Sequence, residues 1–214
     1  ELQKKWQENP TLQIAHANGM DFRFVSREEY RNKESLTQNL QKEFPDALII
    51  PEGGTNHQAV KGVQHMLNEG TKSFDYLCTA VGTGGTVAGL SKFAEEDQQV
   101  LGFKAVNDPT LENEVFRLSG RKNYKLFEAH HGSYGKITDE NIRFINNFSE
   151  YYGIQLDPVY TGKMMRLIFR LIEEDFFPEN ARILAFHTGG LQGISGANRM
   201  LEEQNRPLIK LIKS

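Results

Sequence analysis

The chain has 214 residues, which is enough for one large domain or for one domain and part of another. Its formal net charge is −3 and it contains no basic run, so nothing in its charge suggests a nucleic-acid partner. No apolar run approaches the length of a membrane span, and no signal peptide is visible. The single cysteine, Cys78, excludes an internal disulfide and fits a reducing compartment, so we expect a cytoplasmic protein.

The first quarter of the chain carries alternating helix and strand signals. Gly19 is a helix stop, and Ser26 with Glu29 forms a capping box that begins a further helix. The predicted elements are the end of a helix at 1–8, a helix at 10–18, a strand at 21–25, a helix from Ser26, and a strand at 47–50 before Pro51.

The remainder continues the alternation, which favours a parallel sheet covered by helices. The strongest helix pattern lies at 163–177, where Leu167, Ile168, Leu171 and Ile172 are predicted to face a core. The other predicted elements are a helix at 57–68, strands at 76–81, 100–106, 125–127 and 183–186, a helix from Val87, a helix from Thr138, and a last helix after the final strand.

The chain is organised around residues 76–90, where a short apolar strand runs into a glycine turn and then a helix. Glycines permit positive φ and close backbone approach, and the first N–H groups of a helix attract negative charge. We therefore predict a cup for one phosphate group; its residues are Gly82, Thr83, Gly84, Gly85 and Thr86. The alternative is a tight strand-to-helix turn with no ligand.

Two familiar glycine motifs fail at this turn. A dinucleotide fingerprint starting at Gly82 requires glycine where the chain has Val87, and a P-loop starting at Gly84 requires lysine where it has Leu90. Neither a dinucleotide nor a triphosphate is therefore the favoured ligand, and a nicotinamide dehydrogenase is a distant alternative.

Other candidate site residues lie in loops at the ends of predicted elements. Tyr134 and Tyr160 occupy glycine-containing loops, and Thr188 follows a strand, where open α/β sheets bind ligands. Partly buried tyrosines and a helix-capping threonine are the alternatives. The six histidines give no metal-ligand set, so we predict no metal site, and Cys78 lies in a strand too buried for a nucleophile.

Four segments in order resemble one family across essentially the whole chain: residues 51–56 (Pro-Glu-Gly-Gly-Thr-Asn), residues 82–89 (Gly-Thr-Gly-Gly-Thr-Val-Ala-Gly), residues 157–163 (Asp-Pro-Val-Tyr-Thr-Gly-Lys) and residues 187–190 (His-Thr-Gly-Gly). The resemblance is to the D-cysteine desulfhydrase / 1-aminocyclopropane-1-carboxylate (ACC) deaminase family. It implies an α/β fold with a parallel sheet and two domains, of the tryptophan synthase β type, in a homodimer that binds pyridoxal 5′-phosphate and a small amino acid.

The resemblance also implies roles for individual residues. The cofactor phosphate would be held at residues 82–86, and Tyr134 and Tyr160 would face the substrate. Thr161 and Thr188 would lie near the pyridine ring, with Thr188 on its nitrogen. Lys163 is not the family's cofactor-anchoring lysine, which together with the segment that grips the substrate carboxylate matches sequence before Glu1.

We therefore expect a fragment that lacks an N-terminal part and is inactive alone. Residues 1–50 would complete a small domain, and residues 51–214 would form most of a large cofactor-binding domain. The predicted activity of the parent is elimination and deamination of D-cysteine to sulfide, ammonia and pyruvate. The alternatives are ring-opening deamination of ACC and, from another class, a non-catalytic phosphate- or cofactor-binding protein.

Overall fold

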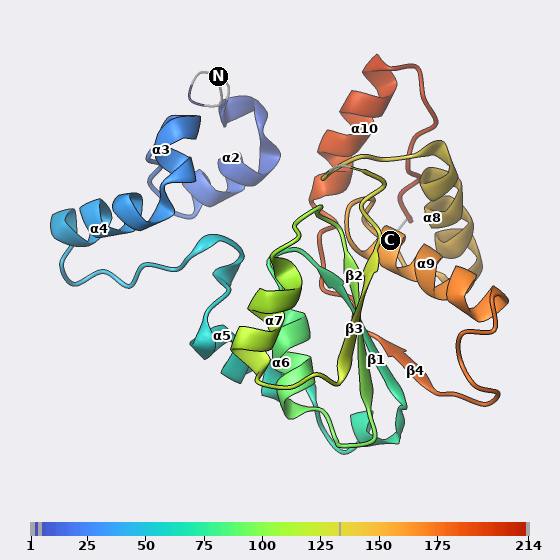
Figure 1. The fold of residues 1–214 in the computed structure, drawn as a ribbon. Coiled ribbons are helices and arrows are strands. Elements are labelled where there is room, and N and C mark those ends of the chain that lie inside the picture. Colours follow the sequence, from blue (N-terminus) through green and yellow to red (C-terminus); the bar gives the residue numbers. More distant parts are fainter. Residues whose placement is uncertain (1–2, 4–5, 133, 213–214) are drawn as a thin grey trace. The chain divides into compact units, whose positions relative to one another are not determined.

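The structure is a computed structural model that describes residues 3, 6–132 and 134–212. It divides into two compact units, Glu1–Pro51 and Glu52–Ser214 (Figure 1). Whether these units correspond to parts of a small and a large domain stays a prediction. No helix in the described ranges has the length and apolar character that crossing a bilayer would require.

The first unit is helical in its described part. The capping box is confirmed, because the Ser26 hydroxyl accepts from Glu29 N–H and the Glu29 carboxylate accepts from Ser26 N–H. The predicted helix at 10–18 is confirmed, whereas the helix end predicted at 1–8 lies partly outside the described residues. The elements are η1 Trp6–Glu8, α2 Pro10–Ala17, α3 Arg27–Arg31 and α4 Lys33–Glu43.

The strands predicted at 21–25 and 47–50 are wrong. Neither segment joins a ladder among the described residues. Phe22 contacts Trp6 edge to face at a centroid distance of 5.2 Å, and Leu48 is 88% exposed. A short apolar run gains strand structure only from a neighbouring strand, and these two runs have none.

The second unit is built on a four-stranded parallel sheet in the order β3-β2-β1-β4 (Figure 1). The predicted strands are confirmed, with small shifts of their ends. Their bounds are β1 Tyr76–Val81, β2 Gln99–Lys104, β3 Tyr124–Glu128 and β4 Ile183–Ala185. Because all four are parallel, their carboxyl ends lie along one edge of the sheet.

Helices cover both faces of this sheet. Leu77 and Val81 of β1 pack in one core with α5, α6 and α7, while Cys78 and Ala80 pack in another with α9. A third core joins α8, α9 and α10. The helices are α5 His57–Val63, α6 Gly85–Phe93, α7 Leu111–Ser119, α8 Asp139–Tyr152, α9 Thr161–Glu173 and α10 Gly193–Glu203, with short turns η2 Glu52–Gly54, η3 Gln64–Met66 and η4 Thr71–Ser73.

Three helix predictions need correction. The helix predicted at 57–68 ends at Val63 and continues as a 3₁₀ turn. Helix α7 was not anticipated. Helix α9 begins two residues earlier and ends four residues earlier than the predicted range 163–177. Leu167, Ile168 and Leu171 are buried as predicted, whereas Ile172 in the last turn is 49% exposed. Only the stripe that faces the sheet is buried.

Candidate functional site

The glycine loop between β1 and α6 forms an open helix N-terminus. Gly84 has φ +89°, a left-handed conformation that costs a residue with a side chain about 1–2 kcal/mol. No side chain caps α6 among the described residues, and the first N–H that bonds back to the cap is that of Ala88, 3.0 Å from the Gly84 oxygen. The preceding N–H groups therefore have no intrahelical partner and suit an anion.

A second loop, residues 53–55, closes one side of this N-terminus. The hydroxyl oxygens of Thr55 and Thr83 lie 2.5 Å apart. A Cβ on Gly85 would lie 2.8 Å from the Thr55 hydroxyl, and a Cβ on Gly53 would lie 2.5 Å from that of Thr83. The two glycines therefore allow hydroxyl groups to approach the helix end. Thr55 was missed by the sequence analysis, although its Gly-Gly-Thr context matched the resembling family.

The turn after β4 leaves the sheet beside this loop. β4 pairs with β1, and Phe186 N–H donates to Cys78 O at 2.9 Å. Thr188 follows as an exposed residue. His187 Nδ1 accepts a hydrogen bond from Gly189 N–H at 3.2 Å. The proton of a neutral imidazole is then on Nε2, which donates to Gln155 O at 2.8 Å. The structure thus places Thr188 at the same edge as residues 82–86.

Asp157 organises the N-terminus of α9. It is 2% exposed, and its carboxylate accepts from the N–H groups of Val159, Tyr160 and Thr161, each at 2.8 Å. The Thr161 hydroxyl donates to the same carboxylate at 2.6 Å and accepts from Asp157 N–H at 2.9 Å. Thr161 is fully buried. Its hydroxyl therefore fixes the loop, a role that sequence reasoning did not assign.

This loop presents Tyr160 to the glycine loop. A Cβ on Gly82 would lie 3.4 Å from the Tyr160 ring, so the phenol covers the start of the cup. The Tyr160 oxygen lies 3.1 Å from that of Tyr134, which is 61% exposed. Burial, followed by the hydrogen bond with Tyr134, raises the pKa of Tyr160 well above its ordinary value. Tyr160 is therefore a protonated phenol at neutral pH.

Cys78 is excluded from this site. It lies within β1 with no exposed surface, and burial raises the pKa of its thiol to about 12. The prediction that Cys78 lies in a buried strand is confirmed.

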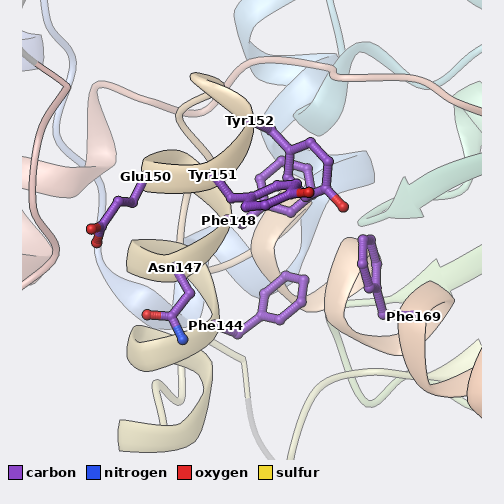
Figure 2. A pocket seen from close by; sticks show the side chains of 7 residues that line it. All are labelled: Phe144, Asn147, Phe148, Glu150, Tyr151, Tyr152 and Phe169. Carbon is purple, nitrogen blue, oxygen red and sulfur yellow. The ribbon is translucent and has the colours of Figure 1, made fainter.

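A different surface carries an aromatic cleft. It measures about 580 Å³ and lies between α8 and α9. Figure 2 shows the rings of Phe144, Phe148 and Tyr152 on the side of α8 that faces Phe169, with Glu150 directed away from it. This cleft is lined mainly by aromatic side chains, with Asn147 and Glu150 as its other lining residues, and it shares no lining residue with the glycine loop.

Comparisons with known proteins bear on the fold and the relatives of this chain. No protein-family model matches the chain. A crystal structure of an ACC deaminase homologue superposes with a TM-score of 0.71 and 29% identity, covering 89% of this chain and 65% of that one. The fold is thus the parallel α/β fold of pyridoxal-phosphate enzymes of type II.

Sequence relatives carry the same names. A Pyrococcus horikoshii protein with the provisional name ACC deaminase is 33% identical over 75% of this chain and 54% of its own length. The Arabidopsis thaliana mitochondrial bifunctional D-cysteine desulfhydrase/ACC deaminase is 29% identical over 86% of this chain and 53% of its own length. The chain is a homologue of the D-cysteine desulfhydrase and ACC deaminase proteins, and it spans about half the length of these curated relatives.

Proposed function

We propose that this chain supplies the phosphate cup and the substrate-facing tyrosines of a pyridoxal-phosphate-dependent enzyme that eliminates and deaminates a small amino acid. The observation that carries the proposal is the open N-terminus of α6, walled by Thr55 and Thr83 and covered by the Tyr160 ring. The lysine that anchors the cofactor and the segment that binds the substrate carboxylate, both expected outside this sequence, remain predictions.

The described residues fit the phosphate of this cofactor. Gly84 holds the left-handed turn, and the Thr55 hydroxyl occupies the space that a side chain at Gly85 would need. Free backbone N–H groups and threonine hydroxyls can donate hydrogen bonds to the phosphate, so no lysine or arginine side chain is needed to bind it. When bound, the cofactor delocalises the electrons released at the substrate α-carbon. The cup's contribution is to fix the position of the phosphate, and through it the ring.

Tyr160 and Tyr134 would hold and deliver a proton at the covered end of the cup. Because its pKa is raised, Tyr160 keeps its proton at neutral pH and donates a hydrogen bond. Tyr134 is exposed and bonded to Tyr160, so it connects this proton to solvent. The pair therefore suits general acid–base work on a substrate bound beside Gly82.

The pyridine nitrogen would meet a hydroxyl rather than a carboxylate. Of the two threonines expected near the ring, Thr161 is occupied by Asp157, whereas Thr188 is exposed and keeps an available hydroxyl. A hydroxyl supplies no compensating charge, so the ring nitrogen is less firmly protonated. Such an electron sink suffices when a thiol leaves the β-carbon, whereas opening an unactivated cyclopropane ring is more demanding. We therefore favour D-cysteine-type elimination over ACC ring opening.

The test compares the two substrates on the whole protein loaded with pyridoxal 5′-phosphate. We expect sulfide and pyruvate from D-cysteine at a kcat/KM at least about tenfold above that for 2-oxobutyrate from ACC. Efficient 2-oxobutyrate release with little sulfide would favour ACC deaminase, the name carried by several relatives. Cofactor binding without either product would favour a non-catalytic binding protein.

The quaternary state and the compartment are part of the same proposal. We propose a homodimer in the cytoplasm, on the grounds of the family resemblance and the single buried cysteine. Sedimentation of the purified protein tests the first point, and imaging of a tagged protein in its native cell tests the second. A monomer or an organellar signal would contradict them.

A further inference from the structure

A second cavity lies on α9, and its lining differs in chemistry from the glycine loop. It measures about 220 Å³, and the residues relevant here are Glu128, His130, His131, Lys163, Arg166 and Arg170. None of residues 82–86, Thr55 and Thr188 lines it. We refer to it as the lysine pocket.

Lys163 is the unusual residue of this pocket. It is 2% exposed, and its Nζ has no hydrogen-bond partner among the described residues. Asp157 attracts it electrostatically, but the Asp157 oxygens already accept the four bonds from residues 159–161. Buried ammonium groups are normally paired, so an unpartnered one that lines a cavity indicates a missing acceptor.

The other charges around the pocket are already balanced. Arg166 pairs with Glu140, Lys104 with Glu128, and Arg170 with Glu174 at 3.3 Å. His130 is also bonded to Glu128, at 2.6 Å, and accepts from Gly132 N–H at 2.9 Å. Among the described side chains that line the cavity, the Lys163 ammonium is therefore the charged group without an ion-pair partner.

His131 provides a second polar group directed to the same place. Its Nε2 lies 3.4 Å from Arg166 Nη1, and its backbone has φ +52°, a left-handed conformation that is strained for a residue other than glycine. Burial lowers its pKa, and Lys163, Arg166 and Lys136 lower it further, against the opposing effect of Glu140. The imidazole is therefore neutral near pH 7 and adds a hydrogen-bonding group without adding charge.

From this arrangement we infer that the lysine pocket binds a small organic monoanion through its carboxylate, held by Lys163 and His131 beside Arg166. One carboxylate neutralises the one uncompensated charge and gives Nζ its missing acceptor. A phosphate dianion would bring more charge than the pocket balances while His131 is neutral. The inference is independent of pyridoxal phosphate, because it rests on residues that do not form the phosphate cup.

The test uses the purified whole protein and titrates it with propionate and with inorganic phosphate in separate arms. We expect propionate to shift the NMR signals of the His131 ring and the Lys163 ammonium saturably, with phosphate binding several-fold more weakly at about pH 8. The Lys163→Met variant, nearly isosteric and uncharged, should bind propionate at least about tenfold more weakly. Lys61→Met on the exposed surface of α5 should bind like the original protein.

Three results would overturn the inference. The first is the absence of a saturable shift at His131 with propionate. The second is equal propionate affinity in Lys163→Met and Lys61→Met, which would show an adventitious surface effect. The third is phosphate binding tighter than propionate, which would assign the pocket to a phosphate source instead. Circular dichroism of Lys163→Met confirms that any loss of binding occurs in a folded protein.

Discussion

The phenol oxygens of Tyr134 and Tyr160 lie 3.1 Å apart, so one hydrogen bond joins an exposed loop residue to a phenol that covers Gly82. The two tyrosines are 26 residues apart in sequence. The loop capped by Asp157 fixes the Tyr160 backbone, while Tyr134 approaches from solvent. The two phenols therefore differ in exposure and surroundings, so the different roles that we propose for them can be tested by single substitutions.

The first prediction concerns these substitutions. Tyr160→Phe should lower kcat by about 100-fold or more, because it removes the phenol that we propose as the proton donor. Tyr134→Phe should lower kcat less and should bring the Tyr160 pKa down toward its ordinary value without reaching it, since burial is the larger cause of the shift. Phenolate formation is followed by ultraviolet titration. The difference between Tyr134→Phe and the variant that carries both Tyr134→Phe and Tyr160→Phe gives the pKa of Tyr160. An unchanged Tyr160 pKa in Tyr134→Phe would contradict the assignment.

Tyr160 also predicts a dependence of stability on pH. Its folded-state pKa lies above its unfolded value, so its contribution to stability is complete below about pH 10 and is lost as pH rises through the folded pKa. Above about pH 10, the free energy of unfolding should therefore fall more steeply for the original protein than for Tyr160→Phe. Urea unfolding across this range checks the slopes, and equal slopes would mean that the phenol titrates normally.

The third prediction separates backbone strain from ligand binding at the cup. Gly84→Ala and Gly120→Ala both force a side chain into a left-handed conformation, at φ +89° and +70°. Each should lose about 1–2 kcal/mol of unfolding free energy. Only Gly84→Ala should weaken pyridoxal-phosphate affinity, because Gly120 ends α7 away from the cup. Calorimetric titration measures the affinity; an equal loss in both variants would argue against the cup.

Local patterns were sufficient to predict the strands of the sheet and the strand-turn-helix stretch that contains residues 82–86. A strand, three glycines and a helix occur within one stretch, so residues 76–81 and the turn at 82–86 could be read without tertiary information. The same reasoning failed for 21–25 and 47–50, because a strand depends on a partner that the sequence does not show. Helix α7 was overlooked although Leu111, Val115 and Leu118 have helical spacing.

The remainder of the site depends on contacts distant in sequence. Thr55 joins the cup only because residues 53–55 pack against Thr83. The burial of Lys163 follows from the packing of α9 against the sheet, which its position in a polar-looking Tyr-Thr-Gly-Lys segment does not reveal. Asp157 looks like a turn residue in sequence, and its role is visible only when its four bonds are seen.

The fourth prediction concerns the burial of Lys163. Its pKa is lowered chiefly by burial, so the folded protein disfavours the charged form. Stability should therefore increase as pH rises from the folded pKa toward the unfolded value of about 10.4, and it should be lower below this window. Lys163→Met should remove this dependence and raise the thermal midpoint at neutral pH. A lower midpoint in Lys163→Met would indicate a partner that stabilises the ammonium in the free protein.

The fifth prediction tests whether Asp157 positions Tyr160 or only stabilises α9. The Asp157 carboxylate accepts four hydrogen bonds, with donor-to-oxygen distances of 2.6–2.8 Å. Asp157→Asn removes its negative charge and replaces one accepting oxygen with an NH₂ group, which can only donate. Unfolding free energy should fall by about 1–3 kcal/mol. Thr138→Ala is the matched control, since Thr138 caps α8 through Asn141 N–H at 3.1 Å and should cost about 1 kcal/mol.

The two caps should differ in their effect on catalysis. Two of the bonds to Asp157 come from Tyr160 and Thr161 N–H groups, so Asp157→Asn releases the backbone that holds the phenol over Gly82. We expect kcat to fall by about tenfold to 100-fold with a smaller change in KM, because misplacing the phenol that we propose as the proton donor would affect the reacting complex. Thr138→Ala should leave kcat unchanged. If both variants kept full kcat at a temperature where both are folded, Asp157 would be a helix cap without influence on Tyr160.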